Sequence, residues 1–388
     1  MREEDENQKK IAVGQYVIAV LAAMLQGETV PQLPEELTWE EVYQEASRQS
    51  LEAMVLAGVE PRIREKPELL SVWRKRRDAD LVQALTQISE QERVLASFSQ
   101  AGIPVLRVKG SALRGLYPRP EYRQMSDVDL IVAPQDMERA DALLCTLGYQ
   151  TEQKERRQSN EVSYFLPPYM SIELHDNPVE RVDPRMVYYE NIWTKTEPEA
   201  TMPGVYHLRT EDEYLYLLAH FLKHYETAGV GIRQVMDVYL FRCAYGSQMD
   251  ADYLAQESRA LQLEPVRSEV EQLADHWFGK TDVQEASNEA VEKMGRFCIL
   301  AGIYGNQYTR RSNMIQKEQQ KGGGWKLRYI WRRLFPPMNE FQMRYPKVRS
   351  APWLYPFYWL QRLFNPVYWK KNFRNEMMEM HSANQKNR

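Results

Sequence analysis

The sequence predicts an α+β fold, in which a small mixed sheet with flanking helices lies between N-terminal helices and a C-terminal helical region. Three observations lead to this prediction. Residues 103–108, 127–132 and 171–175 are short apolar or alternating runs, which are typical of strands. A helical pattern separates the first two runs, and several more follow residue 210. Strands and helices in this order, followed by helices alone, indicate an α+β class.

Three helices are expected before the first strand. Residues 8–28 carry apolar side chains at helical spacing until two prolines break the pattern. A second helix is expected to begin after Thr38, with Glu41 as its capping-box partner, and to continue to about Leu56. A third covers residues 73–100. Its expected apolar stripe consists of Leu81, Leu85, Ile88, Val94 and Phe98.

Residues 101–205 are expected to form the sheet and its own helices. The elements are a strand at 103–108, a helix at 111–117, a strand at 127–132, a helix at 134–147, and a hairpin of 162–165 with 171–175. Helices are expected afterwards at 211–225, 233–244, 250–262, 265–278 and 283–304. A chain of 388 residues exceeds the usual single domain. We therefore expect two or three units from the length. The pattern of elements divides the chain into four regions, at 1–100, 101–205, 206–310 and 311–388.

Charge is distributed unevenly along the chain. The net charge is only −4, which gives no sign of nucleic-acid binding by the chain as a whole. Residues 317–388, however, contain 15 Lys and Arg against 4 Asp and Glu, a net charge of +11. This basic, aromatic-rich stretch suits packing on the acidic body, binding of RNA or another polyanion, or contact with a membrane surface.

The cysteines and the N-terminus predict a cytoplasmic protein. Cys145, Cys243 and Cys298 are widely spaced and odd in number, so neither a disulfide framework nor a zinc site is expected. The first six residues are polar and mostly charged, unlike a secretory signal. The apolar run at residues 16–25 is half the length that a membrane span needs, so no transmembrane segment is expected.

Two acids at the start of an apolar strand are the most informative pattern. Asp127 and Asp129 are two residues apart, so their side chains project from the same face of the expected strand. Glu173 supplies a third acid on another short strand. Carboxylates are the ligands that Mg²⁺ and Mn²⁺ prefer, so the three acids predict a metal site for triphosphate chemistry. Each acid alone has a plainer interpretation as a polar strand entry or a solvated strand residue.

A nucleotide-binding turn is expected directly after the first strand. Gly110 and Ser111 begin a helix there, and their backbone N–H groups and the hydroxyl suit phosphate oxygens. Lys109 and Arg123 add cations nearby. A Gly-Ser pair by itself usually only ends a strand. The prediction depends on its occurrence together with the three acids.

Later residues offer weaker signals. His220 and His224 are four apart on an expected helix, but they lack the third ligand of a zinc site, and packing or nucleotide contact is favoured. Arg233 begins another helix and is a candidate for binding phosphate. The plainer interpretation is an ion pair with Asp237, one helical turn further on.

The chain resembles the polymerase-beta-like nucleotidyltransferase superfamily. More narrowly, it is similar to the uncharacterised bacterial nucleotidyltransferases of the NTP_transf_5 kind over roughly residues 75–380. The matching features are Ala101-Gly102-Ile103-Pro104, Lys109-Gly110-Ser111, Tyr117-Pro118, Arg123, Ser126-Asp127-Val128-Asp129-Leu130, Glu173-Leu174-His175, His220, His224, Gly229-x-Gly231-x-Arg233 and Asp237. Two departures from the superfamily pattern are Lys109, where an apolar residue is usual, and the 17-residue step from Gly110 to Asp127.

The resemblance implies a transferase that moves NMP from an NTP to an unidentified acceptor and releases pyrophosphate, with Mg²⁺ or Mn²⁺ as cofactor. Its metal and catalytic residues would be Asp127, Asp129 and Glu173. Its nucleotide-binding residues would be Lys109, Gly110, Ser111, Arg123 and Arg233.

Two other functions stay open. A glycosyltransferase can use an Asp-x-Asp pair to hold the metal of a nucleotide sugar, although there the apolar strand usually precedes the acids. A nucleotide-binding module without catalysis is the third possibility, and the presence of all three acids argues against it.

Overall fold

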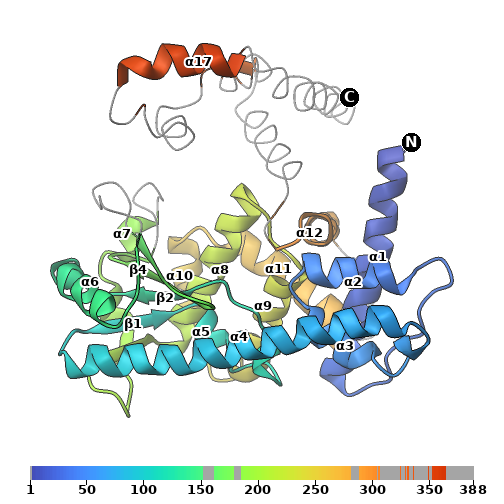
Figure 1. The fold of residues 1–388 in the computed structure, drawn as a ribbon, viewed down its shortest axis with the longest axis horizontal. Coiled ribbons are helices and arrows are strands. Elements are labelled where there is room, and N and C mark those ends of the chain that lie inside the picture. The colour runs from blue at the N-terminus through green and yellow to red at the C-terminus, as the bar shows by residue number, and fades with distance from the viewer. Residues whose placement is uncertain are drawn as a thin grey trace. The chain divides into compact units, whose positions relative to one another are not determined.

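The structure, a computed structural model, describes residues 2–151, 161–178, 185–280, 288–303 and 352–363, together with residues 305, 324, 328, 330, 331, 335 and 348. The fold is of the α+β class, as the sequence predicts (Figure 1). The chain divides into two compact units. The first consists of Met1–Tyr225 with Val230–Tyr304, and the second of Glu226–Gly229 with Gly305–Arg388. The first unit contains the sheet.

The sheet is mixed, with the strand order β3-β4-β2-β1-β6-β5. Its strands are β1 (Val105–Val108), β2 (Val128–Ile131), β3 (Glu161–Leu166), β4 (Met170–His175), β5 (Thr196–Pro198) and β6 (Val205–Leu208). The predicted hairpin is confirmed as the antiparallel pair β3 and β4. β2 runs parallel to β4, and β1 runs parallel to β6. The sequence did not predict β5 and β6, because runs this short carry almost no periodicity.

The N-terminal helices are α1 (Arg2–Gln26), α2 (Trp39–Arg48), α3 (Glu52–Val59) and α4 (Pro67–Gln100). The capping box of Thr38 and Glu41 is confirmed at the start of α2. The single helix expected up to Leu56 is wrong, because the chain turns between α2 and α3. Ser50 has a positive φ of 50° there, and the side chain of Gln49 accepts a hydrogen bond from the backbone N–H of Ile232 at 2.9 Å.

α4 runs from the N-terminal helices to the sheet (Figure 1). Its expected apolar stripe is partly wrong, since Leu85 is 52% exposed, whereas Asp80 and Gln87 are buried. The buried polar residues hold the loop that leads into β2. Gln87 donates from Nε2 to the carbonyl oxygen of Met125 at 3.0 Å, and Gln124 donates to Asp80 at 2.5 Å. The middle of α4 therefore positions a loop instead of filling the core.

The remaining helices of the first unit follow the expected order, except that α7 was not expected from the sequence. They are α5 (Gly110–Arg114), α6 (Met137–Thr146), α7 (Met186–Tyr189), α8 (Thr210–Thr227), α9 (Ile232–Tyr245), α10 (Ala251–Ala260), α11 (Glu264–Phe278) and α12 (Glu289–Ala301). The start of the last expected helix, at 283–287, lies outside the described residues. Short 3₁₀ turns separate several of these elements, among them η2 (Pro120–Tyr122).

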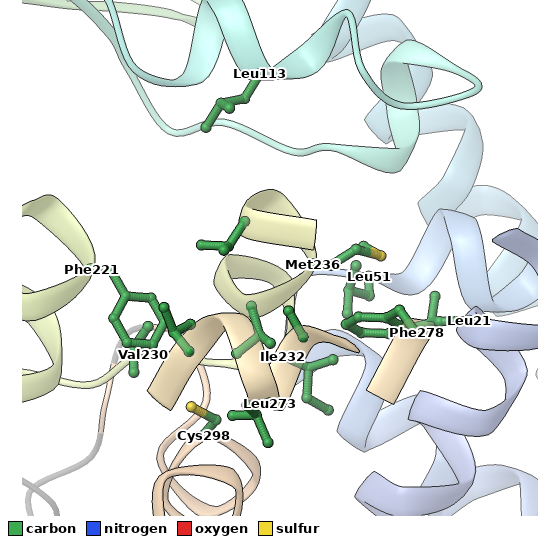
Figure 2. Close-up of a cluster of buried hydrophobic side chains, with 14 of the residues drawn as sticks. Leu21, Leu51, Leu113, Phe221, Val230, Ile232, Met236, Leu273, Phe278 and Cys298 are labelled. Carbon is green, nitrogen blue, oxygen red and sulfur yellow. The ribbon is translucent and has the colours of Figure 1, made fainter. Parts of the chain in front are cut away.

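Two hydrophobic clusters stabilise the first unit. The smaller one packs α4 and α6 against one face of the sheet, through residues such as Phe98, Leu144 and Leu130. The larger one joins the N-terminal helices to α8, α9, α11 and α12. Figure 2 shows part of it, with Leu21 beside Phe278 and with Ile232 among the helices that follow the sheet. The other face of the sheet therefore points toward the helical part of this unit.

α1 is the one helix among the described residues that is long and apolar enough to cross a membrane. Half of that stretch is buried inside the protein, where α1 contacts α2, α3, α11 and α12. This burial is what a core helix requires. In the second unit, α17 (Tyr355–Leu363) is described, and Phe357 on it is 68% exposed. Most of the basic C-terminal stretch lies outside the described residues.

Candidate active site

β2 and β4 bring the predicted acids together. These strands are parallel neighbours, and their register places Asp129 directly beside Glu173. Asp127 immediately precedes β2 and projects from the same face as Asp129, because side chains alternate along a strand. Val128 and Leu130 project from the opposite face and are buried in the cluster with α4 and α6. The alternation that fills the core on one face thus collects carboxylates on the other.

We call Asp127, Asp129 and Glu173 the acidic cluster. Burial raises the pKa of the Glu173 carboxyl to about 8, and the charges of Asp127 and Asp129 act in the same direction. Burial and the Asp129 charge also raise the pKa of Asp127. Burial disfavours the charge of Asp129 as well, but Lys109 and His175 outweigh it and hold the pKa of Asp129 below its ordinary value. Burial and mutual repulsion therefore make it unfavourable for all three carboxyl groups to be ionised at once.

Lys109 lies at the turn between β1 and α5, next to the acidic cluster. Its Nζ is 2.5 Å from Oδ1 of Asp129. The backbone of Lys109 has φ +59° and ψ −126°, a conformation that side-chain-bearing residues rarely adopt. Glu213 on α8 accepts a hydrogen bond from the Lys109 N–H at 3.2 Å, and Arg123 donates to the carbonyl oxygen of Gly110 at 3.3 Å. Two buried side chains thus hold this turn in place.

His175 contacts the acidic cluster from the end of β4. It is buried, and its Nε2 lies 3.1 Å from Oδ1 of Asp129 and 3.7 Å from Oε2 of Glu173. Its Nδ1 lies 3.8 Å from Oε2 of Glu161 on β3. The imidazole is therefore enclosed by three carboxyl groups. This arrangement fixes the ring and, through it, the orientation of Asp129.

The acidic cluster lines a cavity of about 370 Å³. The predicted site residues that line it are Lys109, Gly110, Arg123, Asp127, Asp129, Glu173 and Arg233. Ser111 follows Gly110 as the second residue of α5. One wall of the cavity, not predicted from the sequence, is formed by α8, which contributes Glu213, Tyr216, Leu217 and Lys223. The spacing of three or four residues that these share with His220 and His224 is the signal that could have found them.

Arg123 and Asp237 form a buried ion pair in the wall of the cavity. Arg123 donates from Nε to Oδ1 of Asp237 at 2.8 Å and from Nη2 to Oδ2 at 3.0 Å. Tyr117 donates from its hydroxyl to the same Oδ1 at 2.8 Å. The predicted loop between α5 and β2 is thereby attached to α9. Arg233, one helical turn before Asp237, donates to the carbonyl oxygen of Gln124 at 2.8 Å.

His220 and His224 lie side by side on α8, with their Nε2 atoms 3.1 Å apart. Burial lowers the pKa of His220 well below its ordinary value, and the nearby Lys109 charge acts in the same direction. His220 is therefore neutral near pH 7. Both rings line the cavity, which is consistent with nucleotide contact or packing.

Two residues of the acidic cluster, Asp129 and Glu173, form with His175 a group of side chains that fits a divalent cation. Ligand atoms of Asp129, Glu173 and His175 lie within 4.8 Å of one another. Carboxylate oxygens suit Mg²⁺ and Mn²⁺, and an added imidazole is tolerated by Mn²⁺. Burial raises the pKa values of Asp127 and Glu173, and repulsion from the neighbouring carboxylates adds to that rise. A bound cation would relieve that repulsion.

Comparisons with curated sequences and with solved structures show distant similarity at most. No curated protein sequence matches it. Two solved structures are similar to it at low identity. The antibiotic-resistance factor ANT(2'')-Ia is 13% identical, covers 50% of this chain and 97% of its own, and has a TM-score of 0.34. JHP933 from Helicobacter pylori is 12% identical, covers 62% of this chain and 97% of its own, and has a TM-score of 0.31.

The sequence model of one family, described as uncharacterised nucleotidyltransferase, matches residues 35–279. The match spans more than half of the 388 residues and includes both strands that carry the acidic cluster. The chain therefore belongs to this family of uncharacterised nucleotidyltransferases.

Proposed function

We propose that the protein is a metal-dependent nucleotidyltransferase, which transfers NMP from an NTP to an acceptor hydroxyl or a similar group. Membership of the family supports nucleotidyl transfer in general. The observation that carries the metal-dependent form is the register of β2 and β4. It places Asp129 beside Glu173, and both line one cavity with Asp127.

The chemistry is an in-line displacement at the α-phosphorus. Divalent cations neutralise the triphosphate and stabilise the charge that develops in the transition state. The acceptor oxygen forms a bond to the α-phosphorus, the bond to the bridging oxygen breaks, and pyrophosphate leaves with that electron pair. The acceptor must also lose its proton. We assign Glu173 to accept it, because its side chain is 27% exposed, whereas that of Asp129 is 6% exposed.

The nucleotide-binding part of the proposal rests on the turn after β1. Gly110 begins α5, so backbone N–H groups at the start of this helix are available to phosphate oxygens. Ser111 follows it, and Lys109 precedes it at the edge of the cavity. Arg123 and Arg233 are positively charged groups of the same cavity wall. Together they would balance the charge of a triphosphate.

Labelled-NTP transfer tests the proposal directly. The protein is incubated with each labelled NTP, with Mg²⁺ or Mn²⁺, and with small-molecule, RNA and protein acceptors. Asp127→Asn, Asp129→Asn and Glu173→Gln should each lower transfer at least about a hundredfold. Asp252→Asn, an exposed acid in the first turn of α10, is the matched control and should leave it unchanged.

Three outcomes would contradict the proposal. Full activity in the acidic-cluster variants would exclude these carboxylates from the reaction. Transfer of a sugar from a nucleotide sugar would support glycosyl transfer. Nucleotide binding without turnover, across all acceptors, would support a binding module. We further propose a cytoplasmic location.

A further inference from the structure

We propose that Lys109 is an internal counter-ion of the acidic cluster, which must release Asp129 before a divalent cation binds and which then pairs with the phosphates of the incoming nucleotide. The inference rests on the proposed function and adds a regulatory step to it. Its consequence is that the metal and the nucleotide bind together, whereas the metal alone binds weakly.

Lys109 and His175 both contact the same oxygen of Asp129. The Lys109 ammonium lies 2.5 Å from Oδ1 of Asp129, and Nε2 of His175 lies 3.1 Å from the same oxygen. The side chains of Lys109 and Asp129 are 20% and 6% exposed, so water screens this pair only partly. The ammonium therefore neutralises the most buried carboxylate of the acidic cluster. A divalent cation that binds the same carboxylate must therefore displace the Lys109 ammonium and is repelled by its positive charge.

The backbone conformation of Lys109 is unusual. Lys109 is one of three residues other than glycine with a positive φ among those that the structure describes. Such a conformation is unfavourable for a lysine and persists only where neighbouring groups maintain it. Glu213 binds the Lys109 N–H, and Arg123 binds the carbonyl oxygen of the next residue, Gly110. These two hydrogen bonds hold the backbone of the turn, whereas the Lys109 side chain keeps its rotatable bonds.

Lys109 also lies near the other residues that are proposed to bind phosphate. Lys109 lines the same cavity as Arg123 and Arg233, the other cations proposed to bind the triphosphate. Its stem is therefore anchored between the acidic cluster and the expected phosphates. A lysine ammonium is a compact charge with three donors on a flexible stem, so it can exchange one anionic partner for another. By thermodynamic linkage, a nucleotide that draws Lys109 away from Asp129 raises the affinity for the metal, and the metal raises the affinity for the nucleotide.

Mn²⁺ binding tests the proposal without any turnover. The affinity of Mn²⁺ alone is measured by electron paramagnetic resonance for the wild-type protein and for Lys109→Met. Removal of the ammonium should tighten Mn²⁺ binding at least about tenfold. Lys195→Met is the matched control, because Lys195 also pairs with a buried carboxylate, that of Asp212 at 3.3 Å, but does not line the cavity. It should leave the affinity unchanged.

The affinity of the metal–nucleotide complex should change in the opposite direction. The probe is the Mn²⁺ complex of an NTP analogue with a non-hydrolysable α,β bond, tested with all four bases. Lys109→Met should bind the best of these at least about tenfold more weakly than wild type. A misfolded variant would instead bind both Mn²⁺ alone and the Mn²⁺–nucleotide complex more weakly. Lys109→Gly removes the ammonium while relieving the positive φ, and it should reproduce both changes.

The outcomes separate this inference from the proposed function. Mn²⁺ binding that Asp129→Asn abolishes but that neither Lys109 variant tightens would overturn the counter-ion role and leave the proposed function standing. Absence of Mn²⁺ binding in the wild type, with or without nucleotide, would contradict the proposed function itself. Tighter Mn²⁺ binding together with weaker nucleotide binding in both Lys109 variants would support the inference.

Discussion

Arg123 and Asp237 are 114 residues apart in the chain and form a buried ion pair with two parallel hydrogen bonds. The pair attaches the loop before β2 to α9. Since Arg123 also binds the carbonyl oxygen of Gly110, it connects α9 to the proposed phosphate site. The shape of the cavity therefore depends on a contact between the loop that leads into β2 and a helix much further along the chain.

Asp237→Ala should lower the free energy of unfolding by about 3–5 kcal/mol, because it leaves the Arg123 guanidinium buried without its partner. Urea unfolding measures this change. Lys66→Met is the control, since it removes an exposed ion pair with Glu40 and should affect stability far less. Equal losses in the two variants would show that the burial of Arg123 is unimportant.

Gly110→Ala should destabilise the turn that carries the proposed phosphate site. A Cβ at this position would lie 2.8 Å from Cε of Met125 and 2.9 Å from Nη1 of Arg123, so these side chains would have to shift. We expect a loss of about 1–3 kcal/mol in urea unfolding, together with weaker nucleotide binding.

Gly115→Ala provides the matched control for that substitution, five residues further along the chain. There the nearest atom to the new Cβ is the carbonyl oxygen of Ala112, at an ordinary distance of 3.8 Å. Stability should change by no more than about 0.5 kcal/mol. If Gly110→Ala behaved in the same way, the turn would be less tightly packed than the structure shows.

Asp80→Asn should stabilise the protein at pH 8 but not at pH 4. Burial raises the pKa of Asp80 to about 7 from its ordinary value of 3.8, against the attraction of Arg76. The folded protein thus keeps this proton over a range in which the unfolded chain has released it. The stabilising contribution of the Asp80 proton is therefore complete below about pH 4 and is lost as the pH rises through about 7.

Asparagine stays neutral at every pH, so Asp80→Asn should remove this loss. Because the substitution also removes the ion pair with Arg76, we expect a gain of only about 1–2 kcal/mol at pH 8. Urea unfolding of both proteins at pH 4, 6 and 8 measures the difference. A difference between variant and wild type that is the same at all three pH values would show that Asp80 does not titrate as described.

His175→Asn should weaken metal-dependent activity by about 10–100-fold, the usual effect of removing a residue that orients a metal ligand. The reason is the contact between Nε2 of His175 and Oδ1 of Asp129. His175→Gln keeps an amide nitrogen near the position of Nε2, so it should retain much more activity. The metal concentration that gives half of the maximal rate should rise in His175→Asn. An unchanged value would limit His175 to a packing role.

The acidic cluster was predictable because alternation along a strand is a local property. Asp127 and Asp129 must share a face wherever their strand lies, and the hairpin that carries Glu173 has its own local pattern. The pairing of β2 with β4 was not predictable from spacing, since a parallel register depends on the rest of the sheet. The turn at Ser50 and the polar middle of α4 escaped prediction for the same reason, because their side chains bind distant loops.

The cavity wall contributed by α8 likewise depends on contacts between distant residues, which local sequence patterns do not reveal. Glu213 is buried and its pKa is raised to about 7, yet nothing around it in the sequence distinguishes it from Glu211 and Asp212. Its carboxylate accepts a hydrogen bond from the backbone N–H of Lys109, which is 104 residues away. Contacts of this kind are decided by how helices approach the sheet, and that approach is set by the large cluster of buried side chains (Figure 2).

By itself, the sequence determined the α+β class, most of the helices, the shared face of two acids and the nucleotidyltransferase resemblance, because each depends on residues that are near neighbours in the chain. The tertiary structure alone decided that Glu173 lies beside Asp129, that Lys109 binds Asp129, and that Asp237 holds Arg123. These contacts join segments that come together only when the sheet and the helices bury their apolar faces against one another.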